Sequence, residues 1–514
     1  MGACVKHFVA NEAETERHTV DVRVDEATLR EVYLLPFEIA VADADPWMLM
    51  AAYNRVDGVP ATEHDALLNG VVKGEWGYPG VVVSDWFATR TAAGSANGGL
   101  DLVMPGPFGP WGDALVAAVE QGEVAEDVVD DHLRRVLRLA DRVGALGNPP
   151  TSPVDVPLPT DPVRREALLR WAVAGMTVLR NDGALPLAAD GTVALIGIPA
   201  RETLLMGGGS AEVTPPHQVS VLDGLTAALP GRVVDGGGVE VGDAAPPARP
   251  GFVTDPEDGR PGLRLRLVAA DGAVLQDEHL AGTRRVLGWE GELDATGTRA
   301  RLSARIEHTG PLQVGVIGLG SWTVTAGAGR EELVVAPVTG MPGEALRAPP
   351  PRLLSMDVDG PLLLEAEVDL GEEPHAMIGL IARPAPVPDD EAIAAAVAAA
   401  RSADVAVVVI GLTADQETES VDKTTLALPG AQHALVTAVA AVATRTVVVV
   451  NAATPVLMPW LADVDAVLVA GLPGQEGGAA VAAALLGTQE PAGRLVTTWP
   501  AADGATPAWS VTPV

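Results

Sequence analysis

The sequence predicts an α/β protein that is interrupted by an all-β module. Short apolar runs alternate with helical patterns up to about residue 245 and again after Pro386. This pattern is typical of parallel sheets covered by helices. Between residues 247 and 385 apolar and polar residues alternate instead, as in 263–269 and 299–307, and such alternation predicts the strands of a sandwich or barrel. The 514 residues are enough for about three domains.

In residues 1–147, strands and helices are predicted to alternate. The strands are expected at Cys4–Ala10, Trp47–Tyr53, Val81–Ser84 and Leu100–Met104. The helices are expected at Asp25–Ala40, Glu63–Lys73 and Glu126–Val143. A closed (β/α)8 barrel needs about 250 residues, so these residues by themselves predict either a small open sheet or part of a barrel.

A proline-rich segment at 148–162 predicts an extended linker before the second α/β region. In that region, helices are expected at Val163–Leu179, Asp390–Ala400, Gln432–Val442 and Gly477–Leu486, and strands at Thr192–Ile198, Val405–Ile410, Val447–Asn451 and Ala466–Ala470. The simplest organisation is one α/β domain, 163–246 plus 386–514, with the β module 247–385 inserted into it.

The composition excludes several functions. The 68 acidic and 34 basic residues give a net charge of −34, which disfavours nucleic acids and anionic membranes as partners. The single cysteine, Cys4, excludes an intramolecular disulfide and a thiolate zinc cluster. No apolar run reaches the ~18–20 residues of a membrane span. The N-terminus lacks the apolar core of a signal peptide, so a cytoplasmic location is expected.

Asp85 is the first candidate for chemistry, because it ends the apolar run 80–84. An acid at the carboxyl end of a buried strand can serve as nucleophile or general base, although it can also cap the next helix. Trp86 beside it suits a carbohydrate, or else packs in the core. Lys6 and His7 can hydrogen-bond sugar hydroxyls, and Met50 and Tyr53 end the next apolar run.

Other motifs are less informative by themselves. Glu417, Glu419, Asp422 and Lys423 form an acidic loop after an expected strand, and a solvated loop is the simpler interpretation. The glycine clusters at 207–211 and 318–329 lack the context of a phosphate or dinucleotide site and predict turns. The nine histidines show no metal-binding spacing, so no metal is expected.

Longer motifs carry a resemblance to a known family. They are KHFVANEAETER at 6–17, LLNGVVKGEWGYPGVVVSDW at 67–86, GLDLVMPGP at 99–107, VLRNDGALPL at 178–187 and LPGQEGG at 472–478. Together they resemble the glycoside hydrolase family 3 β-glucosidases over nearly all of both α/β portions. The β module resembles a PA14 domain through GPLQVGVIGLGSWTV at 310–324.

The resemblance implies a retaining double displacement between carboxylates about 5–5.5 Å apart, without a cofactor. Asp85 matches the nucleophile. The acid/base loop resembles ExEGxDR and reads ETESVDK at 417–423, so Glu419 matches the acid/base and Glu417 is the alternative. Ser420 and Lys423 depart from the glycine and arginine of that motif. The same resemblance assigns sugar binding to Lys6 and His7, the lining of the nucleophile to Met50 and Tyr53, and the aglycone side to Trp86.

The family's first domain is a (β/α)8-type barrel, and residues 1–147 match only its later strands. The expected fold is therefore a partial barrel, truncated at the N-terminus, followed by an α/β sandwich interrupted by the PA14-like module. The expected function is exo-β-glucosidase action on a small oligosaccharide or an aryl or alkyl β-glycoside. A catalytically impaired carbohydrate-binding remnant and β-xylosidase specificity are the alternatives. A second copy of the chain, forming a homo-oligomer, is a candidate partner that would complete the site.

Overall fold

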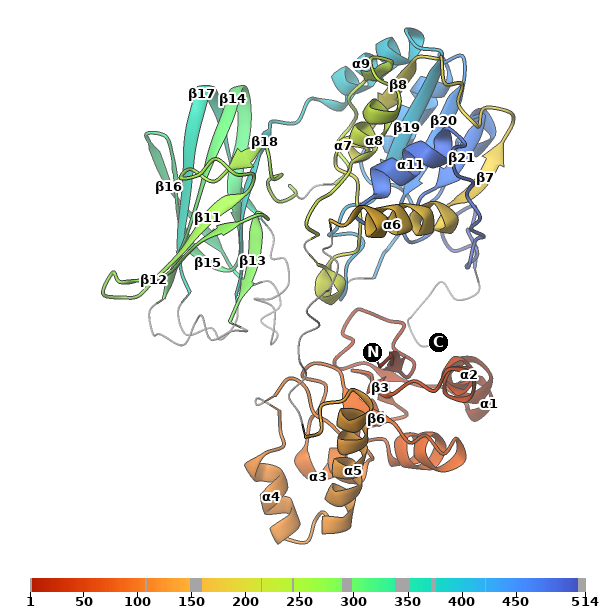
Figure 1. Cartoon of the computed structure of the whole chain (residues 1–514), viewed down its shortest axis with the longest axis vertical. Coiled ribbons are helices and arrows are strands. Elements are labelled where there is room, and N and C mark those ends of the chain that lie inside the picture. Colours follow the sequence, from red (N-terminus) through yellow and green to blue (C-terminus); the bar gives the residue numbers. More distant parts are fainter. Residues whose placement is uncertain are drawn as a thin grey trace. The chain divides into compact units, whose positions relative to one another are not determined.

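The computed structural model describes residues 2–106, 109–147, 160–213, 215–242, 245–288, 298–337, 351–370, 376–420 and 422–506. The chain divides into two compact units. The first unit comprises Met1–Val156 and Ser420–Asp422, and the second comprises Pro157–Glu419 and Lys423–Val514. Figure 1 shows both units and labels many of their elements. Most of the predicted linker, 148–159, lies outside the described residues.

The first unit contains a parallel sheet of three strands. Their order is β1 (Cys4–Phe8), β3 (Met48–Ala51), β6 (Val81–Ser84). Leu49 of the central strand pairs with Val5 on one side and Val82 on the other. All four residues of β6 are buried, which explains why its first three residues are all valine. The three strands confirm three of the four strand predictions for this region.

Helices surround this sheet. Their bounds are α1 Glu26–Thr28, a π-helical segment Leu29–Leu34, α2 Leu35–Ala44, a second π-helical segment Ala66–Glu75, α3 Ala92–Asn97, α4 Asp113–Glu120 and α5 Glu126–Arg142. A small second sheet is formed by β2 Asp21–Val22, β4 Arg55–Val56 and β5 Val59–Pro60. In α5, Arg134 and Arg135 each donate to an aspartate four residues earlier, and such pairs support a helix by ~0.2–0.5 kcal/mol each.

The predicted strand Leu100–Met104 is wrong. Only Leu102 forms a β-bridge, with Val83. The reason is Asp101, whose buried carboxylate accepts the backbone N–H of Val82 at 2.8 Å. The Asp101 side chain therefore accepts a backbone N–H of β6 that would otherwise be available for hydrogen bonding between strands. Among the described residues of this region no barrel closes, and the partial barrel remains a prediction.

The second unit contains a six-stranded sheet. Its order is β7 (Thr177–Asn181), β21 (Ala466–Val469), β20 (Thr446–Asn451), β19 (Val405–Gly411), β8 (Val193–Ile196), β9 (Val233–Asp235). Only β7 is antiparallel to its neighbour, and the other pairings are parallel. This confirms the predicted α/β character of the second region.

Helices cover both faces of this sheet (Figure 1). Their bounds are α6 Pro162–Gly175, α7 Ile198–Arg201, α8 Val221–Ala228, α9 Asp389–Arg401, α10 Gln432–Ala440 and α11 Gly477–Leu485. On β19, Val405, Val407 and Val409 pack with α6, α8 and α11, whereas Ala406, Val408 and Ile410 pack with α9 and α10. Both faces of the strand are buried, so its sequence does not alternate. Within the part of the chain described, we find no helix whose length and apolar character would suffice to cross a bilayer.

The predicted helix Val163–Leu179 is too long. It ends at Gly175, and Met176 already has an extended backbone. From Thr177 the chain forms β7 and pairs with β21. The β-branched pair Thr177 and Val178 favours a strand over a helix, and pairing with the sheet edge overrides the helical pattern.

Between β9 and α9, every described element is a β-strand. The bounds are β10 Val253–Thr254, β11 Leu263–Val268, β12 Val274–Leu280, β13 Arg284–Leu287, β14 Arg299–Ile317, β15 Gly320–Ala326, β16 Gly329–Val335, β17 Arg352–Asp369 and β18 Ala376–Pro384. All belong to one nine-stranded antiparallel sheet system. Its core includes Leu265, Leu302 and Trp322. The module is therefore all-β, as predicted, while its PA14 identity and the domain boundaries remain predictions.

Candidate active site

Asp85 follows β6 at the carboxyl edge of the three-stranded sheet. Its backbone N–H donates to the carbonyl oxygen of Ala51 at 3.0 Å, which fixes it to β3. The residue is 8% exposed. Nε2 of His7 lies 3.2 Å from Oδ2 of Asp85, and the backbone N–H of Trp86 donates to Oδ1 at 2.7 Å. Both carboxylate oxygens therefore have a partner, and the structure brings Asp85 and His7 together.

Tyr53 lies just beyond β3 and is buried. The ring of His18 lies 4.1 Å from its ring, centroid to centroid, and Cζ of Arg17 lies 4.7 Å from the tyrosine centroid. A guanidinium at this distance is attracted to the face of an aromatic ring. Nη1 of Arg17 also donates to Oε2 of Glu14 at 3.0 Å. Tyr53 is thus held in place by groups of the segment that follows β1.

The other predicted sugar-binding residues lie on or next to the same strands. Lys6 is an exposed residue of β1, and Met50 is a half-buried residue of β3. Trp86, the residue after Asp85, is 36% exposed. An exposed indole beside a carboxylate offers an aromatic face to the C–H groups of a sugar. The first unit therefore presents donors, a carboxylate and an aromatic surface at neighbouring strand ends.

Glu419 belongs to the second unit, where the turn Gly207–Ala211 holds it. Its Oε1 accepts the backbone N–H of Ser210 at 2.8 Å and also the hydroxyl of Ser210. Gly209, at φ +75°, makes this close approach feasible, because a Cβ at that position would lie 2.9 Å from Cγ of Glu419. The glycine cluster is a turn, as predicted. In the structure this turn binds the carboxylate of Glu419.

Glu417, the alternative acid/base, is in a different environment. Its side chain is 6% exposed. Oε1 accepts the backbone N–H groups of Ala453 at 3.0 Å and Thr454 at 3.3 Å, and the Thr454 hydroxyl at 3.1 Å. Nζ of Lys423 lies 3.5 Å away, although burial lowers the pKa of this lysine more than Glu417 raises it. Glu417 therefore fixes the loop after β20 and serves as a structural anchor.

The segment Ser420–Asp422 clusters with the first unit, where Glu14 and Thr15 bind it. Oε2 of Glu14 accepts the backbone N–H of Ser420 at 2.6 Å. In return, Asp422 accepts the backbone N–H groups of Glu14 at 3.0 Å and Thr15 at 2.8 Å. Burial acts to raise the pKa of Asp422, but these hydrogen bonds lower it below its ordinary value. Ser420 has φ +69°, a conformation that favours glycine.

Sequence reasoning missed several residues of this arrangement. Glu14, Arg17 and His18 lie in or beside the motif 6–17, of which only Lys6 and His7 were assigned a role. Ser210 lies in the glycine turn, which had no role. The spacing Lys-His-x6-Glu-x2-Arg was the available signal for Glu14 and Arg17. Nothing local in the sequence indicated that Ser210 would meet Glu419, because 209 residues separate them.

Two groups of acidic and histidine side chains among the described residues are close enough to hold a cation. One is Asp101, Asp131 and His132, and the other is Asp255, Asp258 and His279. In the first group, Lys73 Nζ already lies 2.6 Å from Asp101. In the second, Arg264 takes part in the ion pairs of Asp255. A lysine or arginine side chain of the protein thus already balances charge in each group. We therefore assign both groups a structural role within their units.

Comparison with known proteins identifies the family. The model of the glycosyl hydrolase family 3 N terminal domain matches residues 1–139, and that of the family 3 C-terminal domain matches residues 176–513. A β-glucosidase of Rhizobium radiobacter is 36% identical over 98% of this chain, and β-glucosidase B of Emericella nidulans is 34% identical over 99%. The chain belongs to glycosyl hydrolase family 3. It spans 62% of the length of each of these two relatives.

Solved structures agree with this assignment. The β-glucosidase of Kluyveromyces marxianus in complex with glucose aligns over 98% of this chain and 63% of its own, with a TM-score of 0.87 and 26% identity. DesR, a β-glucosidase from Streptomyces venezuelae in complex with D-glucose, aligns over 98% of this chain and 60% of its own, with a TM-score of 0.66 and 30% identity.

Proposed function

We propose that this chain is a retaining exo-β-glucosidase that removes terminal β-linked glucose by double displacement. The observation that carries the proposal is the setting of Asp85, an acid at a parallel strand end whose two oxygens are oriented by His7 and by the Trp86 N–H. The names of the family 3 relatives support glucosidase rather than another glycosidase activity. β-Xylosidase specificity has no comparable support.

In the first step, a carboxylate oxygen of Asp85 attacks the anomeric carbon and forms a glycosyl ester. The bond from that carbon to the leaving oxygen breaks as Glu419 transfers its proton to this oxygen. In the second step, Glu419 removes a proton from water, and the water oxygen displaces Asp85 at the same carbon. Glucose leaves with its β configuration, Asp85 is again a carboxylate and Glu419 is again protonated. The cycle is complete without a cofactor.

The assignment of Glu419 over Glu417 is supported by their contacts. The Glu417 side chain is only 6% exposed and accepts three hydrogen bonds from Ala453 and Thr454 on one oxygen, so it has little access to a leaving group. The hydrogen bonds that Glu419 accepts from Ser210 are solvent-exposed. Lys6 and His7 would contact sugar hydroxyls, Met50 and Tyr53 would line the nucleophile, and Trp86 would face the aglycone. The β module, as a PA14-like domain, would limit the substrate to short glycosides. A cytoplasmic location remains part of the proposal.

The test is release of nitrophenol from 4-nitrophenyl β-D-glucoside by the full 514-residue chain. We expect activity that Asp85→Ala abolishes and that Asp43→Ala, at an exposed position on α2, leaves unchanged. Aryl β-xylosides in the same assay should react more slowly than the glucoside. A well-folded wild-type chain without activity on any aryl glycoside would contradict the proposal and favour a carbohydrate-binding remnant.

A further inference from the structure

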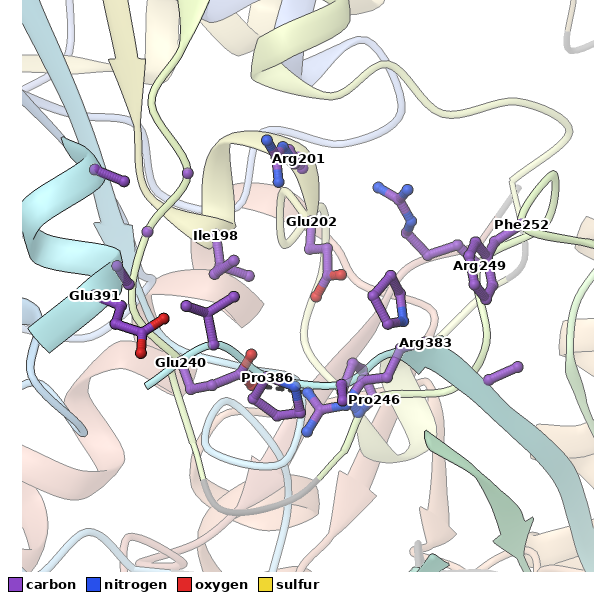
Figure 2. A pocket seen from close by; sticks show the side chains of 18 of the residues that line it. Ile198, Arg201, Glu202, Glu240, Pro246, Arg249, Phe252, Arg383, Pro386 and Glu391 are labelled. Atoms are coloured by element: carbon purple, nitrogen blue, oxygen red, sulfur yellow. Dashed lines mark hydrogen bonds and ion pairs between the residues drawn. The ribbon is translucent and has the colours of Figure 1, made fainter. Parts of the chain in front are cut away.

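The second unit contains a cavity of about 300 Å³ that does not include Glu419. It lies outside the carboxyl ends of β8 and β9, beside the turn 236–238. One wall is α7 with Glu202, which follows it, and another is the start of α9. The two connections to the β module, around 246–252 and 382–387, complete the wall (Figure 2). Crevices at the carboxyl ends of parallel strands are common ligand sites, and this volume is at the lower end for small-molecule pockets.

The charged side chains of the lining balance one another. Three arginines and three glutamates line the cavity, namely Arg201, Arg249, Arg383, Glu202, Glu240 and Glu391. Their formal charges sum to zero, although the whole chain carries −34. A net-neutral lining that offers both donors and acceptors disfavours a strongly charged ligand, because either sign of charge would meet an opposing group.

Part of the lining is held rigidly. Nη1 of Arg383 donates to Oε2 of Glu240 at 2.7 Å, and its Nε donates to Oε1 of Gln313 at 3.0 Å. Nε of Arg201 donates to Asp235 at 2.7 Å. These bonds fix two of the three arginines by partners within the protein. The cavity wall is therefore ordered in advance, which reduces the entropy lost when a ligand binds.

Three charged side chains of the lining, Glu202, Arg249 and Glu391, have no such partner in the described part of the chain, and all three residues are exposed to solvent. Among the residues that the structure describes, the side chains of Glu202 and Arg249 make no hydrogen bond or ion pair with protein groups. Figure 2 shows the carboxylate of Glu202 pointing into the cavity and Arg249 extending from the wall that carries Phe252. Reduced hydration in this recess raises the pKa of Glu202, and Glu240 adds to the shift, while Arg249, Arg383 and Arg201 oppose it.

Apolar groups supply the rest of the wall. Phe252, Pro246 and Pro386 line the cavity together with Ile198. A ligand for this wall needs hydroxyl groups for Glu202 and Arg249 and C–H faces for the ring and prolines. We propose that this cavity is a second binding site, separate from the catalytic carboxylates, for a neutral polyhydroxylated ligand of one or two sugar rings. The inference does not rest on the proposed hydrolysis.

Cellobiose is the probe, titrated calorimetrically into the full chain carrying Asp85→Ala, which prevents turnover. We expect Glu202→Gln and Arg249→Ala each to weaken one binding event at least about tenfold, as for the loss of a hydrogen bond of ~1.4 kcal/mol. Glu166→Ala and Arg170→Ala, at exposed positions of α6, are the matched controls and should change nothing. In the otherwise wild-type chain, Glu202→Gln should leave nitrophenyl glucoside hydrolysis unchanged.

Unaltered cellobiose binding in both variants, with unfolding temperatures equal to that of the parent, would overturn the inference. So would absence of cellobiose binding, or tighter binding of inorganic phosphate than of cellobiose in an Arg249-dependent manner. Failure of the proposed function would appear differently, as missing hydrolysis by the wild-type chain, and would leave the effect of Glu202→Gln on binding intact.

Discussion

Asp85 and Glu419 are two carboxylates that the protein holds in opposite ways. Asp85 directly follows a buried strand, and its backbone is tied to Ala51 of the neighbouring strand. Glu419 lies on a loop, and the partner described for its carboxylate is Ser210 of another turn. A nucleophile must attack along one line, and a strand end provides that precision. An acid/base must serve a leaving oxygen and then a water, and a loop allows that adjustment.

The largest expected effect tests whether the loop carboxylate is the acid. Glu419→Ala should lower kcat/KM for cellobiose by about 10²–10⁴-fold, the usual contribution of a general acid. A 2,4-dinitrophenyl glucoside should lose much less in the first step, because its leaving group departs without a proton. Asp85→Ala should lose activity on both substrates. Equal losses on both substrates for Glu419→Ala would refute its role as acid.

The next effect separates Glu417 from Glu419. Glu417→Ala should destabilise the second unit by about 2–3 kcal/mol, because two backbone donors and Lys423 lose a buried acceptor. Denaturant titration followed by tryptophan fluorescence measures this change. Glu490→Ala, at an exposed position, is the control. A normal unfolding midpoint combined with the leaving-group dependence described for Glu419 would make Glu417 the acid instead.

A smaller effect tests Gly209, whose backbone closely approaches the side chain of Glu419. Gly209→Ala places a Cβ 2.9 Å from Cγ of Glu419 and forces alanine into φ +75°. Gly231, at φ +72° with no atom within 4 Å of its Cβ position, is the matched control. Both variants should lose about 1–2 kcal/mol from the left-handed backbone. Only Gly209→Ala should also reduce kcat for a substrate that needs protonation. Equal kcat values in the two variants would show that the contact is unimportant.

The smallest effect concerns Ser420. Ser420→Gly removes the strain of a non-glycine residue at φ +69° but adds freedom to the unfolded chain, at a cost of about 0.5–1 kcal/mol. The net change in unfolding free energy should stay within about 0.5 kcal/mol. Asp57→Gly, at φ +48° and remote from the loop in sequence, is the control. It combines the same relief of backbone strain with the same gain in freedom of the unfolded chain, but outside the loop. A loss above 1 kcal/mol only in Ser420→Gly, by thermal unfolding, would mean that the serine side chain holds the loop.

The sequence correctly predicted strands that are buried on both faces and a helix with one continuous apolar face. β6, β19 and α5 were found within one residue of their observed bounds, because continuous apolar runs and strong amphipathic patterns leave few alternatives. The predictions failed where a tertiary contact decided the local structure. Asp101 replaced a ladder bond near Leu102, and the sheet edge at β21 recruited Thr177–Asn181 as a strand.

Residue types and motifs alone determined the α/β character, the inserted β module, and Asp85, His7 and Glu419 as candidates. The signal for the fold class and for Asp85 is local, since it consists of periodicity and of a polar residue that ends an apolar run, whereas Glu419 became a candidate through the family resemblance. Tertiary structure decided which side chains meet: His7 with Asp85, Ser210 with Glu419, and Glu417 with Thr454. These partners come from separate stretches of the chain, and only the packing of strands and turns brings their atoms within hydrogen-bonding range.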